Sequence, residues 1–115
     1  MDDGLVFSQL CGSPWYRHHR ARARYLASSV LALQEAPAGQ YFSHVIVRDG
    51  LGLCTLDDIE QAGDARFAFN EPDSQSGVHC LRPRFDMDAQ LAGGLHSGGH
   101  RHSIDAVLAG DADFA

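Results

Sequence analysis

The polar turn at residues 70–77 is the segment whose side chains are best suited to binding a ligand. Residues 70–77 are rich in turn formers and hydroxyl groups, and they end in the pattern Ser74-x-Ser76-Gly77. We expect a strand before this turn and a helix after it, an order that brings unpaired helix N–H groups and the positive end of a helix dipole to one point. Such a point attracts anions, and the two hydroxyls would add neutral donors for a phosphate or a phosphonate. In the simpler alternative, Ser76 only caps the helix.

Three histidines form a second candidate site. His96, His100 and His102 lie close together in the sequence, and Asp105 follows them. A histidine-rich tract can bind a divalent metal, so a metal-binding protein is an alternative interpretation. The tract is interrupted by glycines and lacks a paired motif such as H-E-x-x-H. We therefore favour a hydrogen bond from one of these imidazoles, at the start of a helix, to an anion, and we expect no metal or other cofactor.

No pattern in the sequence indicates an enzyme. The carboxylate pair Asp57-Asp58 is typical of a solvated helix start, and Cys54 and Cys80 are more typical of structural thiols than of nucleophiles. The sequence contains no hydrolase elbow, dinucleotide fingerprint or kinase signature. We expect a binding protein rather than a catalyst.

Composition and charge exclude several other classes. The chain has 115 residues and a net charge of −6, which allows one domain at most. Residues 49–115 carry four arginines against twelve acidic residues, a balance that argues against nonspecific binding of nucleic acid. No stretch approaches the roughly 20 apolar residues of a membrane-spanning helix. The start of the sequence lacks the pattern of an export signal, so on this ground alone the chain is expected in the cytoplasm.

The elements that must position these residues alternate between strands and helices. Segment 25–33 fits either type, because its apolar residues have little periodicity. Capping residues and glycines predict the ends of several helices, such as Thr55 with Gly63 and the terminator Gly110. The pattern favours an α/β domain with a largely parallel sheet. The expected strands are 4–10, 41–48, 65–69 and one beginning at 112–115, and the expected helices are 14–21, 56–62, one beginning at 78–81, 88–91 and 101–108.

The order and spacing of these motifs resemble the phosphate/phosphonate type of periplasmic substrate-binding protein, the soluble receptor of an ABC importer. The likeness covers almost the whole chain. The similar stretches are Val6-Phe7-Ser8-Gln9-Leu10-Cys11-Gly12-Ser13-Pro14, Tyr41-x-Ser43-x-Val45-Ile46-Val47-Arg48, Leu56-Asp57-Asp58-Ile59, residues 70–77, Ser97-Gly98-Gly99-His100 leading to Ala106-Val107, and Gly110-x-Ala112-Asp113.

The resemblance implies a type 2 periplasmic-binding-protein fold, in which two α/β lobes are joined by crossing strands and the oxyanion binds between them. Residues 1–40 would be a remnant of the first lobe, and residues 41–115 the second lobe. The implied ligand is phosphate or a phosphonate, the implied partner is an ABC permease, and the implied location is the periplasm. A related sensor domain is a further possibility. The implied ligand-binding residues are Tyr41, a cleft aromatic and hydroxyl donor, Ser74 and Ser76 with the amides of Gln75, Ser76 and Gly77 around the phosphoryl oxygens, and His100 from the next helix start.

The sequence also departs from that family. The receptors are more than twice as long and start with an export signal, so we expect a truncated receptor, or a fragment without independent function. Gly99 stands where the family often has serine, and Leu10 where threonine is usual. The family members most like this chain carry a second cysteine near positions 35–39, which is absent here. A disulfide from Cys11 is therefore not expected.

Overall fold

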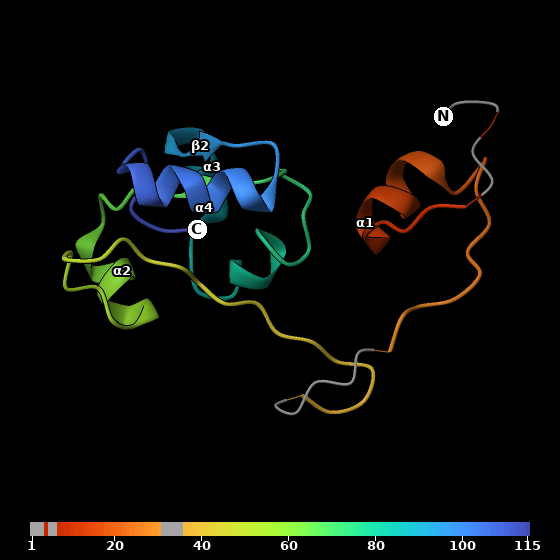
Figure 1. Ribbon diagram of the computed structural model, residues 1–115, viewed down its shortest axis with the longest axis horizontal. Helices are drawn as coiled ribbons and strands as arrows, with labels where there is room; N and C mark the ends of the chain where they lie inside the picture. Colours follow the sequence, from red (N-terminus) through yellow and green to blue (C-terminus); the bar gives the residue numbers. More distant parts are fainter. Residues whose placement is uncertain (1–3, 5–6, 31–35) are drawn as a thin grey trace.

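The computed structural model describes residues 4, 7–30 and 36–115, and it has a mixed α/β architecture. Figure 1 shows α2, α3, β2 and α4 gathered in one part of the molecule, with α1 lying apart from them. In chain order the elements are helix α1 (Gly12–Pro14), π-helical segment η1 (Trp15–His19), helix α2 (Leu56–Ala62), strand β1 (Ala68–Phe69), 3-10 helix η2 (His79–Leu81), helix α3 (Met87–Gly93), strand β2 (Leu95–His96) and helix α4 (His100–Ala109).

The centre of the fold is a set of paired extended segments. Strand β1 pairs in parallel with β2, with Ala68 opposite Leu95. On the other side of β1, Phe114 pairs in parallel with Phe67 and antiparallel with Val47. Across the sheet the order of segments is therefore 46–48, 113–115, 66–69 and 95–97. The predicted parallel pairing is confirmed for β1 and β2, and one edge is antiparallel.

The alternation of side chains along β1 separates two apolar cores. Phe67 and Phe69 face one side, whereas Ala68 packs on the other with Ala106 and Val107 of α4. Small residues on that second side let α4 lie directly against β1. The first core also contains Ile59, Val78, Leu81, Phe85, Met87 and Phe114. The short sheet is thus covered on both faces, as expected for an α/β domain.

Local capping explains where the helices begin and end. Thr55 and Asp58 form a reciprocal capping box at the start of α2, and Gly63 follows the helix with a positive φ of 69°. Asp86 accepts hydrogen bonds from two amides of α3. Gly110 ends α4 in the left-handed conformation, which a glycine adopts without a steric penalty. None of the helices in the described ranges is long and apolar enough to cross a membrane.

Two strand predictions are corrected by the structure. Over residues 41–48, ladder hydrogen bonds form only at 46–48, where Ile46 and Ala115 exchange both backbone bonds at 2.9 and 2.8 Å. Residues 41–45 have suitable residue types but no neighbouring segment to pair with among the described residues. Residues 7–10 are not in a strand either, and residues 5 and 6 of that prediction lie outside the described residues.

The remaining predictions concern mainly helices. The helix expected over 14–21 is present as α1 and η1, and α2, α3 and α4 match the expected helices within about two residues. Residues 25–30 form no regular element, and residues 31–33 lie outside the described residues. The strand expected from 112 is present as the pairing of Phe114. The helix expected to begin at 78–81 is only the 3-10 turn η2.

We predict that Phe114→Ala lowers the free energy of unfolding by about 3–5 kcal/mol, because truncating a buried aromatic side chain leaves a cavity. Phe114 is 1% exposed, and its ring stacks on Phe67 at a centroid distance of 5.0 Å. Urea unfolding followed by circular dichroism measures the change. The control is Leu108→Ala, which removes a side chain that is 79% exposed and should change stability by less than about 0.5 kcal/mol. Equal effects of the two substitutions would contradict the packing described here.

We also predict that Asp58 makes stability depend on pH in the acid range. Hydrogen bonds from the Cys54 amide, the Thr55 hydroxyl and the Thr55 amide lower the pKa of Asp58. A carboxylate with a lowered pKa stabilises the fold above the unfolded-state value, near pH 4, and that stabilisation is lost as the pH falls through the folded-state value. Thermal unfolding from pH 7 to pH 2 should therefore show a shallower acid dependence for Asp58→Asn than for the wild type. Asp64→Asn, at an exposed position, is the control, and identical profiles for wild type and Asp58→Asn would refute the prediction.

Candidate functional site

Apart from Tyr41, the predicted site residues follow the carboxyl ends of β1 and β2. Strand β1 ends at Phe69 and leads into the turn that contains Ser74 and Ser76, whereas β2 ends at His96 and leads to the start of α4. Ligands of open α/β sheets bind in the crevice outside the carboxyl ends of the strands. The turn predicted from the sequence and the start of α4 therefore lie where the fold favours a ligand.

The turn at residues 74–77 has an internal hydrogen-bond pattern that leaves two amides free. Ser74 is 4% exposed, and its Oγ accepts the Gly77 amide at 3.1 Å. The Ser74 carbonyl accepts the amides of residues 78 and 79. The amides of Gln75 and Ser76 have no acceptor among the described residues. The Ser74 hydroxyl therefore shapes the turn, and the free donors lie at Gln75 and Ser76.

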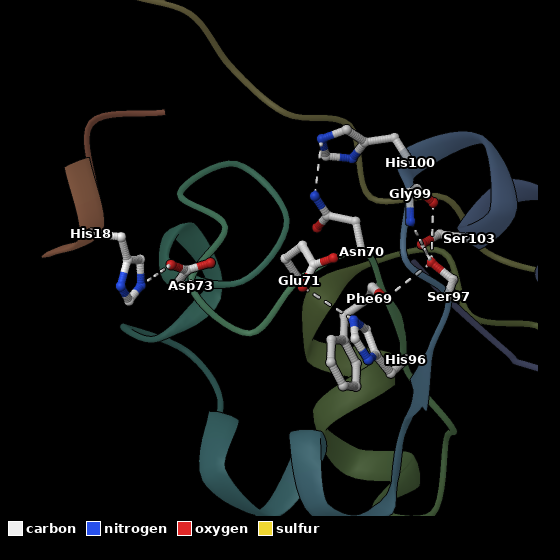
Figure 2. A network of polar contacts seen from close by, with 10 residues as sticks. All are labelled: His18, Phe69, Asn70, Glu71, Asp73, His96, Ser97, Gly99, His100 and Ser103. Atoms are coloured by element: carbon white, nitrogen blue, oxygen red, sulfur yellow. Dashed lines mark hydrogen bonds and ion pairs between the residues drawn. The ribbon is translucent and has the colours of Figure 1, made fainter. Parts of the chain in front are cut away.

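A serine pair holds the start of α4 against β1 (Figure 2). The Ser97 Oγ lies 2.7 Å from the Ser103 Oγ and 3.0 Å from the carbonyl oxygen of Phe69. Gly99 is the residue before the helix and, having no side chain, makes no capping hydrogen bond to the first amides of α4. The first amides of a helix have no acceptor within it, so those of α4 point out of its N-terminal end. The serine pair fixes the direction in which they point.

Two adjoining cavities lie beside these donors. The larger, of about 420 Å³, is lined by Ser76, Gly77 and His100, and the smaller, of about 240 Å³, by Tyr41, Gln75 and Ser76. Ser76 lines both cavities, whereas Tyr41 and His100 lie in different ones. The apolar part of the larger cavity consists of Val45, Ile46, Leu56, Ala68, Phe69, Leu81, Ile104 and Ala115. Neither cavity is lined by an acidic residue or an arginine from the described part of the chain.

Asn70 is a polar residue of this site that the sequence analysis did not select. It directly follows β1, and its Nδ2 lies 3.3 Å from the Nε2 of His100 (Figure 2). Ser43 lines both cavities and was also missed. For Asn70 a signal existed, namely a polar side chain immediately after a buried strand. For Ser43 there was none, because its position depends on the path of residues 41–45.

The alternative metal site is not supported by the structure. His96 lies 3.2 Å from Glu71 and stacks on Phe69, and His100 faces Asn70. Within the described ranges no three His, Cys, Asp or Glu side chains come together as metal ligands. Residues two apart on a helix do not face each other, so His100 and His102 diverge. The histidines are close in sequence but not in a common ligand set.

One further contact links the N-terminal helical segment to the turn. The Nε2 of His18, in η1, lies 3.7 Å from a carboxylate oxygen of Asp73. The two side chains are exposed to different degrees, at 61% and 26%. Exposed ion pairs of this kind contribute little to stability, so this contact orients the segment only weakly.

Comparison with known protein families identifies the class of protein. Residues 10–115 match the model of the family described as ABC transporter, phosphonate, periplasmic substrate-binding protein. The match spans nearly the whole chain, so the chain belongs to this family, as the motif series predicted. Separate comparisons of the chain with curated proteins and with solved structures find no match. The family is periplasmic, and substrate-binding proteins of ABC transporters are typically not enzymes.

We predict that the serine pair at the start of α4 acts as a unit. Ser97→Ala and Ser103→Ala should each lower the free energy of unfolding by about 1–3 kcal/mol, because each leaves a partly buried hydrogen-bonding group without its partner. The double variant should lose at least about 0.5 kcal/mol less than the sum of the two. Urea unfolding measures all three, with Ser29→Ala, an exposed serine, as control. Strictly additive losses would show that the hydroxyls act independently.

Proposed function

We propose that this chain binds a phosphonate or phosphate oxyanion between the turn at residues 74–77 and the start of α4. The observation that carries the proposal is that Ser76 and Gly77 line one cavity together with His100, which is distant from them in sequence, at the carboxyl ends of the strands. The free amide of Ser76 belongs to a residue that lines this cavity, that of Gln75 to one that lines the adjoining cavity, and the first amides of α4 add donors beside His100. Family membership supports the same ligand class.

The proposed site relies on neutral donors and one imidazole. A phosphoryl group has three oxygens, which hydroxyl and amide donors can satisfy through charge-assisted hydrogen bonds. Ser76 would contribute both its hydroxyl and its amide, and His100 would approach from α4. Ser74 acts through the turn, because it is buried and lines neither cavity, and its Oγ accepts the Gly77 amide. Tyr41 would contribute from the smaller cavity, which adjoins the first at Ser76.

The walls of the larger cavity favour an organic substituent on the phosphorus atom. Beside the donors lie Val45, Ile46 and Ile104, which are apolar. An alkylphosphonate would place its oxygens on the donors and its carbon chain against these side chains, and the burial of that chain would add affinity. Phosphate would gain only the polar contacts. We therefore expect the site to prefer an alkylphosphonate over phosphate.

In its biological setting the chain would act as the substrate-binding component of an ABC importer, or as a related sensor domain, with an ABC permease as partner. Residues 41–115 would form the second lobe of the receptor fold, and residues 1–40 a remnant of the first. The paired segments 46–48 and 113–115 support this division, because they hold the second part together as one sheet.

Isothermal titration of the full chain with methylphosphonate tests the proposal. We expect saturable binding, with Ser76→Ala weakening it at least about tenfold, because a hydrogen bond to a charged group is lost. The Ser74→Ala/Ser76→Ala double variant should bind no better than Ser76→Ala. Ser29→Ala is the matched control, at an exposed serine that lines neither cavity. Absence of binding at millimolar methylphosphonate and phosphate would overturn the proposal, as would equal affinity of wild type and Ser76→Ala.

A further inference from the structure

The side-chain amide of Asn70 lies between the two halves of the proposed site. Its Nδ2 is 3.3 Å from the Nε2 of His100, at the start of α4. Its Oδ1 is buried and has no hydrogen-bond partner among the described residues. On the other side lies the turn, where a Cβ at position 77 would come within 2.4 Å of that Oδ1. Asn70 therefore lies against the turn at Gly77 and also contacts the helix start at His100, the second contact being drawn in Figure 2.

Gly77 makes this position of Asn70 possible. A methyl group at residue 77 would also lie 3.2 Å from the Ser74 Oγ, so a side chain there would push against both neighbours. The backbone of Gly77 is not in the left-handed region, so the requirement for glycine is one of space rather than of conformation. The glycine of the S-x-S-G pattern thus leaves space for the side-chain amide of Asn70 as well as for the Ser74 hydroxyl inside the turn.

The chemistry of the two groups in contact determines where the proton of His100 resides. An amide nitrogen has hydrogens and no lone pair to share, so Asn70 Nδ2 can only donate. With the amide nitrogen facing the ring at 3.3 Å, the Nε2 of His100 can take part in this hydrogen bond only as an acceptor, which corresponds to a neutral imidazole with its proton on Nδ1. The Nδ1–H is consequently the only ring donor of His100, and it lies on the opposite side of the ring from Asn70.

We infer that Asn70 is a positioning residue, which holds His100 as the Nδ1–H tautomer and directs that donor toward the anion. The direction toward an anion rests on the proposed function, whereas the tautomer does not. The role differs from that of a ligand-binding residue, because Asn70 acts through His100.

The tautomer can be measured directly in the full chain without any ligand. Long-range proton–nitrogen correlation spectra of ¹⁵N-histidine-labelled protein at about pH 8, above the usual titration range of histidine, report which ring nitrogen carries the proton. His100→Gln assigns the signals. The Nδ1–H form is the minor one for a histidine free in water, so its dominance at His100 would report the contact with Asn70. A dominant Nε2–H form at His100 would overturn the inference.

Substitutions at Asn70 separate positioning from simple stability. Asn70→Asp replaces the donor by a carboxylate that only accepts, so the proton should move to Nε2 of His100. Asn70→Leu keeps a similar size without a donor, so the preference for Nδ1–H should be lost. Both should weaken methylphosphonate binding at least about tenfold. Glu71→Gln, at the adjacent residue, which pairs with His96, is the control and should leave the His100 tautomer unchanged. An unchanged tautomer in Asn70→Leu would overturn the inference.

The outcomes for the two proposals are distinct. If the wild type shows the Nδ1–H form but binds neither methylphosphonate nor phosphate, the proposed function fails and the role of Asn70 toward His100 stands. If it binds methylphosphonate while His100 carries its proton on Nε2, the function stands and the inference fails. The wild-type spectrum decides the second question even where a substituted chain does not fold.

Discussion

The placement of residues 113–115 in the middle of the sheet is the constraint on which the rest of the structure depends. The carbonyl oxygen of Phe114 accepts the Ala68 amide of β1 at 2.8 Å. On the other side, Ala115 exchanges two backbone hydrogen bonds with Ile46 of the segment 46–48. The Asp113 carboxylate adds a side-chain bond to Arg48 at 2.5 Å and accepts the Arg66 amide at 2.8 Å. One short stretch thereby connects the segments 46–48 and 66–69, both of which lie far from it in the sequence. Its aromatic side chain, fully buried, completes the larger apolar core.

The site follows from that arrangement through the two faces of β1. On one face large aromatic residues fill the space between the sheet, α2 and α3, and on the other face Ala68 allows α4 to lie close. Close packing of α4 brings its first residue, His100, level with Asn70 at the end of β1. The turn at residues 74–77 leaves from the same strand end. Small residues in the second core are therefore what brings the two groups of donors to one cavity.

The electrostatic character of the site agrees with the class of protein. The chain is acidic overall, yet the cavities are lined by hydroxyls, amides, imidazoles, the thiol of Cys80 and apolar groups in the described residues. Binding an anion in such a chain depends on short-range, directional hydrogen bonds rather than on a positive surface potential. A site of this kind favours a ligand with several oxygens at fixed geometry. Phosphonates have that geometry, which is consistent with the family to which the chain belongs.

The sequence by itself determined the features that depend on neighbours within about four residues. The capping box of Thr55 and Asp58, the stop at Gly110 and the polar turn with Ser74 were all predictable, because capping and turn formation are local interactions. The motif series also identified the family. Tertiary structure alone decided which apolar segments pair: residues 41–45 resemble a strand, yet only 46–48 meet a partner. It also decided that Asn70 meets His100, thirty positions away, because such contacts arise from the packing of α4 on β1 and not from spacing along the chain.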